Sequence, residues 1–428
     1  MFSLQSLSHS ALQQKQHKLL KKQLEHCAKN IPYYKELLAS LGFDSSTLDD
    51  LEQSQAVLET LPILDKSPIR NNPDAFRDQS LAEGHVYKSF SSGSTGEPFA
   101  SYFDRFTWFR KKYFVKLRAR FACGMQFGQR VAILECEDAE TIAERNRKAK
   151  KMDLILKVRV FSLFQDSSAL LDELRAFDPQ NIYAYPSHLF ELATVLAKTD
   201  ASLTSVKRLF TSSEFLESGM REFIQAQFSA HIYDHYGSTE FKEIAWQCKH
   251  RDWYHINSDE VICEVLNASG EAVYDQPGEI VVTDLRNRAM PLLRFRLGDQ
   301  GIKSKEACGC GYAGDSIKPL GGRASDYLVF QGDVQLSPFR FTTEIEYLPG
   351  VLQYQIEQLS TDLIKVKLRV SSGDGGQEIE GSVTDILRST IAEATSAELA
   401  NAVGIDVVYC DRIENESNGK FKVVKRSF

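Results

Sequence analysis

The sequence predicts an α/β protein that ends in a smaller α+β domain. Between residues 130 and 234, short apolar segments alternate with longer segments of helical periodicity, which is the order of βαβ units in a parallel sheet covered by helices. From about residue 323 the order changes to a hairpin, one helix and one strand. At 428 residues the chain is also too long for one compact core. We therefore expect a large domain with mostly parallel, helix-flanked sheets over residues 1–322 and a small, mobile domain over residues 323–428.

Periodicity and capping residues place the individual elements. The expected helices cover residues 4–29, 104–121, 139–151, 166–177, 187–198 with Ser187 as cap, 214–228 and 376–393, and short helices joined by prolines fill the chain to about residue 85. The expected strands cover residues 86–90, 99–103, 130–135, 157–164, 181–185, 206–211, 231–234, 278–284, 292–299, 351–359, 362–370 and 404–410.

Composition argues against several classes of protein. The formal net charge of −7 disfavours a nucleic-acid surface or an anionic-membrane patch, so the basic and aromatic stretch 104–121 is better explained as a half-buried helix. No apolar run is long enough to span a bilayer, and the N-terminus lacks the apolar core of a secretion signal, so we expect a cytoplasmic protein. Eight cysteines are too sparse for a disulfide framework.

A run of hydroxyls and glycines, Ser91-Ser92-Gly93-Ser94-Thr95-Gly96-Glu97-Pro98, separates the two strands predicted before residue 104. Glycines let backbone N–H groups approach a ligand closely, and the hydroxyls add donors, so the loop suits a phosphate group. An ordinary polar hairpin turn is the alternative. The chain contains no GxxxxGK[ST] sequence, so a lysine for the phosphate would come from elsewhere.

Polar residues also follow two of the predicted strands, where ligands of α/β sheets collect. One group is Thr211-Ser212-Ser213-Glu214, which we expect to open a helix with free N-terminal amides. The other is Asp234-His235-Tyr236-Gly237-Ser238-Thr239-Glu240. A base could stack on Tyr236, a phosphate could contact Thr239, and Glu240 could hold a magnesium ion. A capped helix start or a turn is the plainer alternative for each.

Five segments in this order carry a resemblance to a known family. SSGSTGEP, YGSTE, RFRLGD, GRASDY and NGK resemble the core motifs of the adenylate-forming superfamily, which includes acyl-CoA synthetases, non-ribosomal adenylation domains and luciferases. Ile31-Pro32-Tyr33-Tyr34, Leu61-Pro62-Ile63-Leu64 and the form PLLRFRLGD are similar to the phenylacetate–CoA ligase branch. The resemblance covers essentially the whole chain.

The resemblance implies an AMP-forming acid–thiol ligase that uses ATP, Mg²⁺ and coenzyme A. By motif, Ser91, Ser92, Gly93, Ser94, Thr95 and Gly96 would hold the β- and γ-phosphates, and Ser212, Ser213 and Glu214 would border the adenine. Tyr236, which Gly237 follows, would stack on adenine, and Asp299 would bind the ribose hydroxyls. Thr239 would contact the α-phosphate, and Glu240 would bind magnesium. Arg323 would lie at the domain junction, and Lys420 would bridge the ribose oxygen and the reacting carboxylate.

The chain departs from that pattern at three places. Phe99 stands where the family commonly has a lysine after the loop, as the phenylacetate branch tolerates. Ser212-Ser213 replaces a glycine-rich segment on the adenine side, and Ser325 stands at the usual acidic hinge. The contacts of the adenine side and the hinge motion are therefore less firmly implied than nucleotide binding itself.

Cysteines and histidines form a second group of candidate ligands. Cys248, His255, Cys308 and Cys310 have the composition of a tetrahedral zinc set, with His250 as the substitute for His255. The spacing is not a standard finger pattern, so free thiols remain the alternative to a structural Zn²⁺ ion. Cys27, Cys123, Cys136 and Cys263 are scattered and are expected to be core or surface residues.

The partners follow from the resemblance only in part. We expect a small carboxylic acid as substrate, with aryl or arylacetic acids preferred, and coenzyme A as acceptor. The sequence leaves open whether the acceptor is instead an acyl carrier protein or an amine. It also leaves open a catalytically silent nucleotide- or zinc-binding scaffold and a homodimeric state. Lys420, Glu240 and Asp299 together argue against the scaffold, because binding alone would not need that lysine.

Overall fold

The computed structural model describes most of the chain, which divides into two compact units. The described residues are 7–90, 99–135, 137–150, 156–163, 165, 167–199, 201–323, 327–332, 334–336, 339–346, 348–370, 376–416 and 421–428. Unit 1 consists of Met1–Gly124 and His235–Pro319, and unit 2 consists of Met125–Asp234 and Leu320–Phe428. The unit boundaries at residues 234 and 319 fall inside the strands β7 (His231–Ser238) and β13 (Ser316–Arg323). The domain boundary expected at residue 322 stays a prediction.

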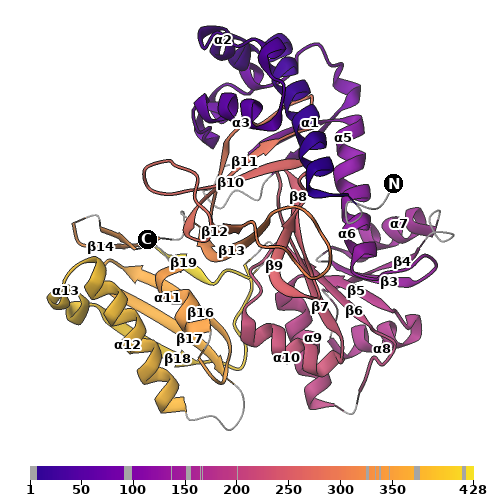
Figure 1. Ribbon diagram of the computed structural model, residues 1–428. Helices are drawn as coiled ribbons and strands as arrows, with labels where there is room; N and C mark the ends of the chain where they lie inside the picture. Colours follow the sequence, from indigo (N-terminus) through magenta and orange to yellow (C-terminus); the bar gives the residue numbers. More distant parts are fainter. Residues whose placement is uncertain are drawn as a thin grey trace. The chain divides into compact units, whose positions relative to one another are not determined.

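Unit 1 begins with helices that pack on one another. They are α1 (His9–Asn30), α2 (Pro32–Ser40), η1 (Ser45–Thr47), α3 (Leu51–Thr60), α4 (Lys66–Asn71), η2 (Pro73–Phe76) and η3 (Glu83–His85). The Ser8 hydroxyl caps α1 by accepting a hydrogen bond from the Ala11 N–H. Leu20, Leu24 and Cys27 line the buried face of α1. Figure 1 shows α1, α2 and α3 side by side in indigo and violet.

The strands of unit 1 are largely antiparallel. They are β1 (Val86–Phe90), β2 (Ala100–Asp104), β7 (His231–Ser238), β8 (Lys242–Cys248), β9 (Arg251–Ile256), β10 (Val261–Leu266), β11 (Pro277–Asp284), β12 (Phe295–Ser304) and β13 (Ser316–Arg323). β1 and β2 form a separate hairpin, and β7, β8 and β9 pair antiparallel in sequence order, as do β10, β11 and β12. After β2, the helix expected over 104–121 is present as α5 (Arg105–Phe109), the π-helical turn η4 (Arg110–Val115) and α6 (Lys116–Ala122).

Unit 2 contains the predicted parallel sheet. Its strands β3 (Arg130–Glu135), β4 (Lys157–Ser162), β5 (Asn181–Ala184) and β6 (Arg208–Ser212) pair in the order β6-β5-β3-β4, all parallel. The intervening helices are α7 (Ala139–Ala149), α8 (Ser167–Phe177), α9 (Pro186–Lys198) and α10 (Ser218–Phe228). Leu174, Phe190, Leu209 and Ile224 are fully buried together in this part of the core, so α8, α9 and α10 pack on the sheet.

The end of unit 2 is the predicted α+β part, with its own core. The strands β14 (Leu328–Phe330) and β15 (Val334–Leu336) form a small pair, and β16 (Val351–Ser360), β17 (Leu363–Val370), β18 (Gly404–Tyr409) and β19 (Val424–Arg426) form a sheet in the order β18-β17-β16-β19. The helices are α11 (Phe339–Glu346), α12 (Gly376–Ala394) and α13 (Ala397–Ala402). Val383, Leu387 and Ile391 of α12 are buried with Ile364, Val366 and Leu368 of β17, in orange and yellow in Figure 1.

The α/β class with a smaller α+β part is confirmed, but the expectation of mostly parallel sheets is wrong, because most of the described pairs among β7 to β13 are antiparallel. Two local expectations are also wrong. Ser187 does not cap α9, because Pro186 is the first helical residue and Tyr185 the cap. The helix expected from Glu214 begins at Ser218, since Ser213 has a left-handed backbone (φ 76°) and the next residues form a connecting segment. Within the described part of the chain, no helix is long and apolar enough to cross a membrane.

Candidate active site and cysteine cluster

Tyr236 and Asp299, which the motifs assign to adenine and ribose, contact each other in unit 1. The Tyr236 hydroxyl donates a hydrogen bond of 2.8 Å to Asp299 Oδ2. Tyr236 lies on β7 and Asp299 on β12, so residues 63 positions apart meet through the fold. Tyr236 is half-buried and packs its edge against the ring of Tyr254, with 6.5 Å between centroids. A partly open aromatic face beside a carboxylate suits a nucleoside.

Only a glycine fits at position 237, because the backbone of β8 comes close to the backbone of β7 next to Tyr236. A Cβ atom at this position would lie 2.0 Å from the carbonyl oxygen of Lys242 on β8. The register between β7 and β8 also shifts between Tyr236 and Gly237, which marks a bulge. The bulge and the glycine together bring the turn at Thr239 and Glu240 close to the sheet.

Glu240 is a buried acid on that turn, with 3% of its surface exposed. Its Oε1 atom lies 3.3 Å from Lys66 Nζ, an ion pair without hydrogen-bond geometry, and accepts no hydrogen bond from the described residues. A buried carboxylate oxygen that lacks a hydrogen bond costs free energy unless a cation approaches it. Lys66 already brings one positive charge to this oxygen, and the role of magnesium ligand that the motif assigns to Glu240 stays a prediction. Thr239 beside it is half-buried.

The carboxylate of Glu214, in unit 2, accepts hydrogen bonds from two separate segments of the chain. Its Oε2 atom accepts the Ser187 N–H at 3.0 Å, and its Oε1 atom accepts the Ser187 hydroxyl at 3.0 Å and the Phe421 N–H at 2.7 Å. Asn415 also contacts Ser187, with 3.3 Å between Nδ2 and Oγ. The carboxylate therefore links the start of α9 to the C-terminal segment, and Phe421 is the residue that follows Lys420.

Ser212 and Ser213 stand between β6 and that carboxylate. The Ser212 hydroxyl is hydrogen-bonded to the Tyr183 hydroxyl and lies 3.3 Å from the Ser213 hydroxyl. The adenine-side segment is thus a chain of hydroxyls rather than a flexible glycine run. Ser213 takes the left-handed conformation that a glycine would adopt more readily.

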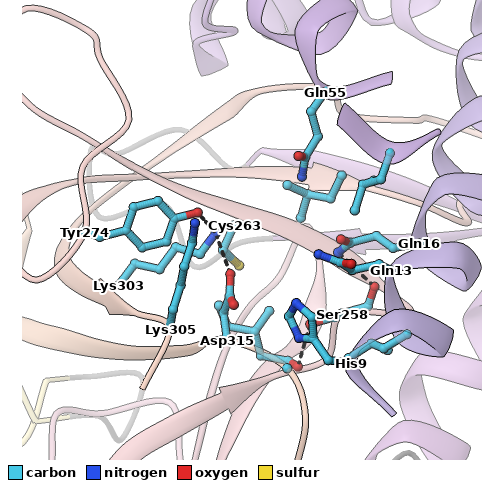
Figure 2. Close-up of a pocket in the computed structure, with 15 residues that line it drawn as sticks. His9, Gln13, Gln16, Gln55, Ser258, Cys263, Tyr274, Lys303, Lys305 and Asp315 are labelled. Carbon is cyan, nitrogen blue, oxygen red and sulfur yellow. Dashed lines mark hydrogen bonds and ion pairs between the residues drawn. The ribbon is translucent and has the colours of Figure 1, made fainter. Parts of the chain in front are cut away.

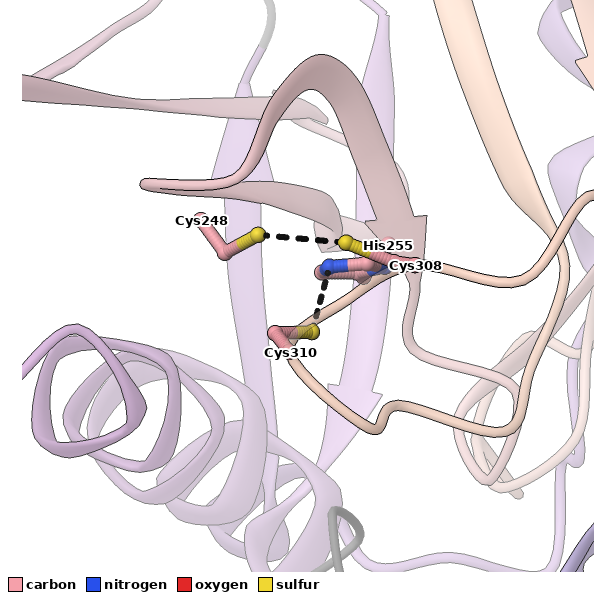
Figure 3. Close-up of side chains that lie close together, drawn as sticks. All are labelled: Cys248, His255, Cys308 and Cys310. Atoms are coloured by element: carbon pink, nitrogen blue, oxygen red, sulfur yellow. Dashed lines mark hydrogen bonds between the residues drawn. The ribbon is translucent and has the colours of Figure 1, made fainter.

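All four predicted zinc ligands come together in unit 1. The ligand atoms of Cys248, His255, Cys308 and Cys310 lie within 4.8 Å of one another. Cys248 Sγ is 3.6 Å from Cys308 Sγ, and Cys310 Sγ is 3.2 Å from His255 Nε2 (Figure 3). Sulfur atoms bound tetrahedrally to one zinc ion at about 2.3 Å would be about 3.8 Å apart, so the four atoms fit a zinc ion.

The strands explain this cluster. Cys248 ends β8, His255 lies on β9, and the two other cysteines lie in the loop between β12 and β13. The His255 ring is buried against the rings of Trp246 and Tyr312, which hold its orientation. His250, the substitute ligand, donates its backbone N–H to Cys248 Sγ at 3.4 Å and is not part of the cluster.

Several predicted site residues cannot be placed in this way. Ser91, Ser92, Gly93, Ser94, Thr95, Gly96 and Lys420 lie outside the described residues, and the side chain of Arg323, which ends β13, does as well. The sequence analysis missed Ser187, Lys66 and Lys242. Nothing local distinguishes these three residues, because each contacts its partner from a distant part of the chain.

A pocket of 170 Å³ in unit 1 is lined by none of the predicted site residues (Figure 2). It is lined by His9, Gln16 and Gln55 from the N-terminal helices and by Tyr274, Lys303 and Asp315, among others. Lys303 Nζ is bound to Asp315 Oδ2 at 3.0 Å and Gln16 Nε2 to the Ser258 carbonyl at 3.1 Å. Because these polar groups satisfy one another, we assign the pocket no role in the reaction.

The architecture matches the fold of solved acyl-CoA ligases. Two solved structures of 2-hydroxyisobutyryl-CoA ligase match it with TM-scores of 0.71 in the postadenylation state and 0.62 in the thioesterification state. The first is 18% identical in sequence and covers 96% of this chain and 89% of its own. The second is 19% identical and covers 97% and 90%.

Curated relatives sharpen this assignment. The phenylacetate–coenzyme A ligase of Thermus thermophilus is 25% identical over 396 residues, which are 88% of this chain and 86% of the relative. The phenylacetate–coenzyme A ligase of Pseudomonas putida is 25% identical over 418 residues, 92% of each. Protein CapK of Staphylococcus aureus is 21% identical over 356 residues, 80% of this chain and 75% of the relative. No protein-family model matches the chain. The resemblance indicated by the five motifs is confirmed.

Proposed function

We propose that the protein activates a small carboxylic acid with Mg-ATP and transfers the acyl group to the thiol of coenzyme A. The observation that carries this proposal is the hydrogen bond from the Tyr236 hydroxyl to Asp299, which joins two of the five ordered motifs. Support also comes from relatives named phenylacetate–coenzyme A ligases and from a structural neighbour solved with an acyl-AMP and coenzyme A.

The reaction has two steps. The carboxylate oxygen attacks the α-phosphorus of ATP, the bond to the β-phosphate breaks, and pyrophosphate leaves. The sulfur of coenzyme A then forms the thioester bond, and AMP leaves while the thiol proton passes to solvent. Negative charge on phosphate oxygens dominates the first transition state, so positioned donors and cations matter more than a nucleophilic side chain.

Residues of this chain would supply those groups. Tyr236 and Asp299 would orient the nucleoside, and the Thr239 hydroxyl would donate to the α-phosphate. Glu240 would hold a magnesium ion, which neutralises phosphate charge when bound. The loop from Ser91 to Gly96 would bind the outer phosphates, and Arg323 would lie near the nucleotide.

A panel of carboxylic acids with Mg-ATP tests the proposal. One acid should produce pyrophosphate and acyl-adenylate in equal amounts, and thioester together with AMP once coenzyme A is added. We expect aryl or arylacetic acids to react faster than long-chain fatty acids. Release of ADP and inorganic phosphate would contradict the proposed chemistry. An acyl carrier protein or an amine that accepts the acyl group in place of coenzyme A would leave the first step intact and change only the acceptor.

Lys420 should matter for only one of the two steps. Phe421, the residue after Lys420, donates its N–H to Glu214, which borders the predicted adenine site. This contact supports a role for Lys420 when the adenylate forms. Its ammonium would neutralise charge as carboxylate and phosphate meet. Lys420→Ala should slow adenylate formation by about 10²–10³-fold, the usual effect of losing one such donor.

The two half-reactions separate this role from others. Supplied acyl-adenylate and coenzyme A should still give thioester at nearly the normal rate in the Lys420→Ala protein. Equal loss of both steps would indicate a disrupted fold, and no change in either would indicate a solvated lysine. Lys422→Ala, two residues further on, is the matched control.

The cysteine cluster is proposed to bind one structural zinc ion. The four ligand atoms come from three separate segments, and their spacing fits tetrahedral coordination. Burial raises the pKa of the Cys310 thiol to about 12 in the absence of a cation, so zinc binding should release protons. Elemental analysis should give about one zinc per chain, by the four-ligand logic. If the purified protein contains no metal and a chelator does not change its melting temperature, the zinc site is excluded.

A further inference from the structure

Lys242 is held in a backbone conformation that lysine seldom adopts. Its φ angle is 63°, in the left-handed region, and its carbonyl oxygen is the atom that a Cβ at Gly237 would meet. Non-glycine residues in this region cost about 1–3 kcal/mol and cluster at functional sites. The side chain is thereby aimed by the β7–β8 turn, the same turn that carries Thr239 and Glu240.

The ammonium of Lys242 is held by hydroxyl and aromatic groups. Its Nζ atom donates a hydrogen bond of 2.6 Å to the Ser89 hydroxyl on β1. It also lies 5.0 Å from the ring centroid of Phe103 and 5.2 Å from that of Trp108. Among the described residues, no carboxylate forms an ion pair with it. Neighbouring lysines differ in this respect, since Lys116 pairs with Glu243 and Lys111 with Asp284.

The electrostatic surroundings favour an anion at this ammonium. The positive charges of Lys116, Lys112 and Lys111 act on this ammonium, and the carboxylate of Glu240 acts on it with the opposite sign. A partly buried ammonium among other cations gains from an approaching anion more than a solvated lysine would. The groups that hold the ammonium are neutral, so the charge that opposes the three lysines comes from Glu240 alone among the causes named here.

The location indicates which anion. Ser89 lies on β1, two residues before the glycine-rich loop that the sequence analysis assigns to phosphate. Phe99, which stands where the resembled family commonly has its loop lysine, is 2% exposed and packs 6.0 Å from the Phe295 ring. Phe99 therefore brings no charge to the phosphates.

We propose that Lys242 binds the β- and γ-phosphates of ATP, and thus pyrophosphate as it leaves. This inference rests on the proposed function, because it assigns a cation to the same nucleotide site. An ammonium that meets the outer phosphates should distinguish ATP and pyrophosphate from AMP. A lysine that only supports β1 through Ser89 would not make that distinction.

Binding measurements with three variants test the proposal. Lys242→Met keeps an unbranched side chain and the same backbone demand but removes the charge, and Lys242→Arg keeps the charge. Lys112→Met is the matched control, because its ammonium also lies near the Trp108 ring, at 5.1 Å. The dissociation constants of ATP, pyrophosphate and AMP are measured by calorimetry with Mg²⁺, and melting temperatures verify the fold.

We expect Lys242→Met to raise the dissociation constants of ATP and pyrophosphate roughly 10- to 100-fold, the range for a lost hydrogen bond from a charged group. The dissociation constant of AMP should not change. Lys242→Arg should recover part of that loss, and Lys112→Met should bind like the wild type. Equal weakening of ATP and AMP, or no weakening, would overturn the proposal.

The same measurements separate this inference from the proposed function. Wild-type protein that binds ATP and AMP but makes no adenylate with any acid would end the proposed function and leave the assignment of Lys242 to be decided by the binding data. Wild-type protein that binds neither nucleotide would overturn both.

Discussion

Two segments of the chain differ in how many acidic side chains they bury. They are the framework segment, Arg130–Phe228, and the site segment, His231–Ser304. In the framework segment Glu217 is the buried acid among the described residues, and the strands bury apolar side chains. The site segment buries many acids, namely Asp234, Glu240, Glu243, Asp259, Glu260, Glu264 and Asp284. Buried carboxylates cost free energy unless partners compensate them, so their concentration in one segment needs an explanation.

The compensation in the site segment is specific. Burial opposes the ionisation of Glu243, but Lys116 and His235 outweigh it and bring the pKa of that carboxyl to about 2. Burial is likewise outweighed at Asp259, where Arg118, Lys15 and Arg110 lower the pKa to about 2. Glu243 and Asp259 thus stay charged in the interior, whereas burial raises the pKa of Glu260 and Glu264. Buried charge is concentrated where the proposed chemistry occurs, whereas left-handed non-glycine residues occur in both segments, at Ser213 in the framework segment and at Lys242 in the site segment.

The largest expected effect comes from removing a ligand of the cysteine cluster. Cys308→Ala should abolish zinc binding and lower the melting temperature by many degrees, because structural zinc contributes about 10–16 kcal/mol of apparent binding free energy. The measurement is zinc content together with thermal unfolding. Cys263→Ala, which removes a buried thiol outside the cluster, should keep the metal. Zinc retained in both variants would refute the ligand assignment.

A core substitution in the framework segment should affect stability alone. Leu209 on β6 is fully buried, and Leu209→Ala should lower the free energy of unfolding by about 2–5 kcal/mol. The adenylation rate per folded molecule should remain that of the wild type. Leu41→Ala, at a position that is 46% exposed, is the control and should change little. A fall in adenylation rate of the folded Leu209→Ala protein would erase the contrast between the two segments.

A small substitution in the site segment should affect both stability and activity. Gly237→Ala would place a methyl group 2.0 Å from the Lys242 carbonyl oxygen, so the β7–β8 turn must move. We expect a loss of about 1–3 kcal/mol in stability, as for overpacking, and a marked loss of ATP affinity. Chemical denaturation and calorimetry measure the two. Gly381→Ala, in α12 with open space around it, is the control and should be neutral or slightly stabilising.

The smallest effect is expected at the one buried acid of the framework segment. Glu217 Oε1 accepts no hydrogen bond from the described residues, and burial raises its pKa well above the ordinary value, with the Glu346 carboxylate adding to the rise. Tyr354 is the other titratable group that faces it. Stability from a protonated Glu217 is complete below the unfolded pKa of about 4.3 and is lost as pH rises through the folded value.

Glu217→Gln should therefore flatten the pH dependence of stability and stabilise the protein at neutral pH, as measured by denaturation at several pH values. The exposed Glu222→Gln on α10 should leave the wild-type profile in place. A variant less stable than the wild type at pH 7 would show that the ionised carboxylate has a partner that stabilises it.

Local patterns predicted the framework segment well. The strands expected over 130–135 and 181–185 are present within one residue, because strand and helix periodicities act between neighbours in the chain. The helix start expected at Glu214 was wrong because its carboxylate is used by Ser187 and the Phe421 N–H, and the helix begins four residues later.

In the site segment the sequence determined residue types, and the tertiary structure decided their partners. The motifs assigned Tyr236 and Asp299 to one nucleoside, and the two side chains do contact each other. Composition was enough to select the four residues that the fold brings together in the cysteine cluster. Nothing local predicts that Lys242 reaches Ser89, 153 residues away. That contact involves a residue with a left-handed backbone, which lies opposite Gly237 beside the bulge in the pairing of β7 with β8. Sequence patterns report interactions over a few residues, whereas the pairing of strands far apart in the chain sets which side chains meet.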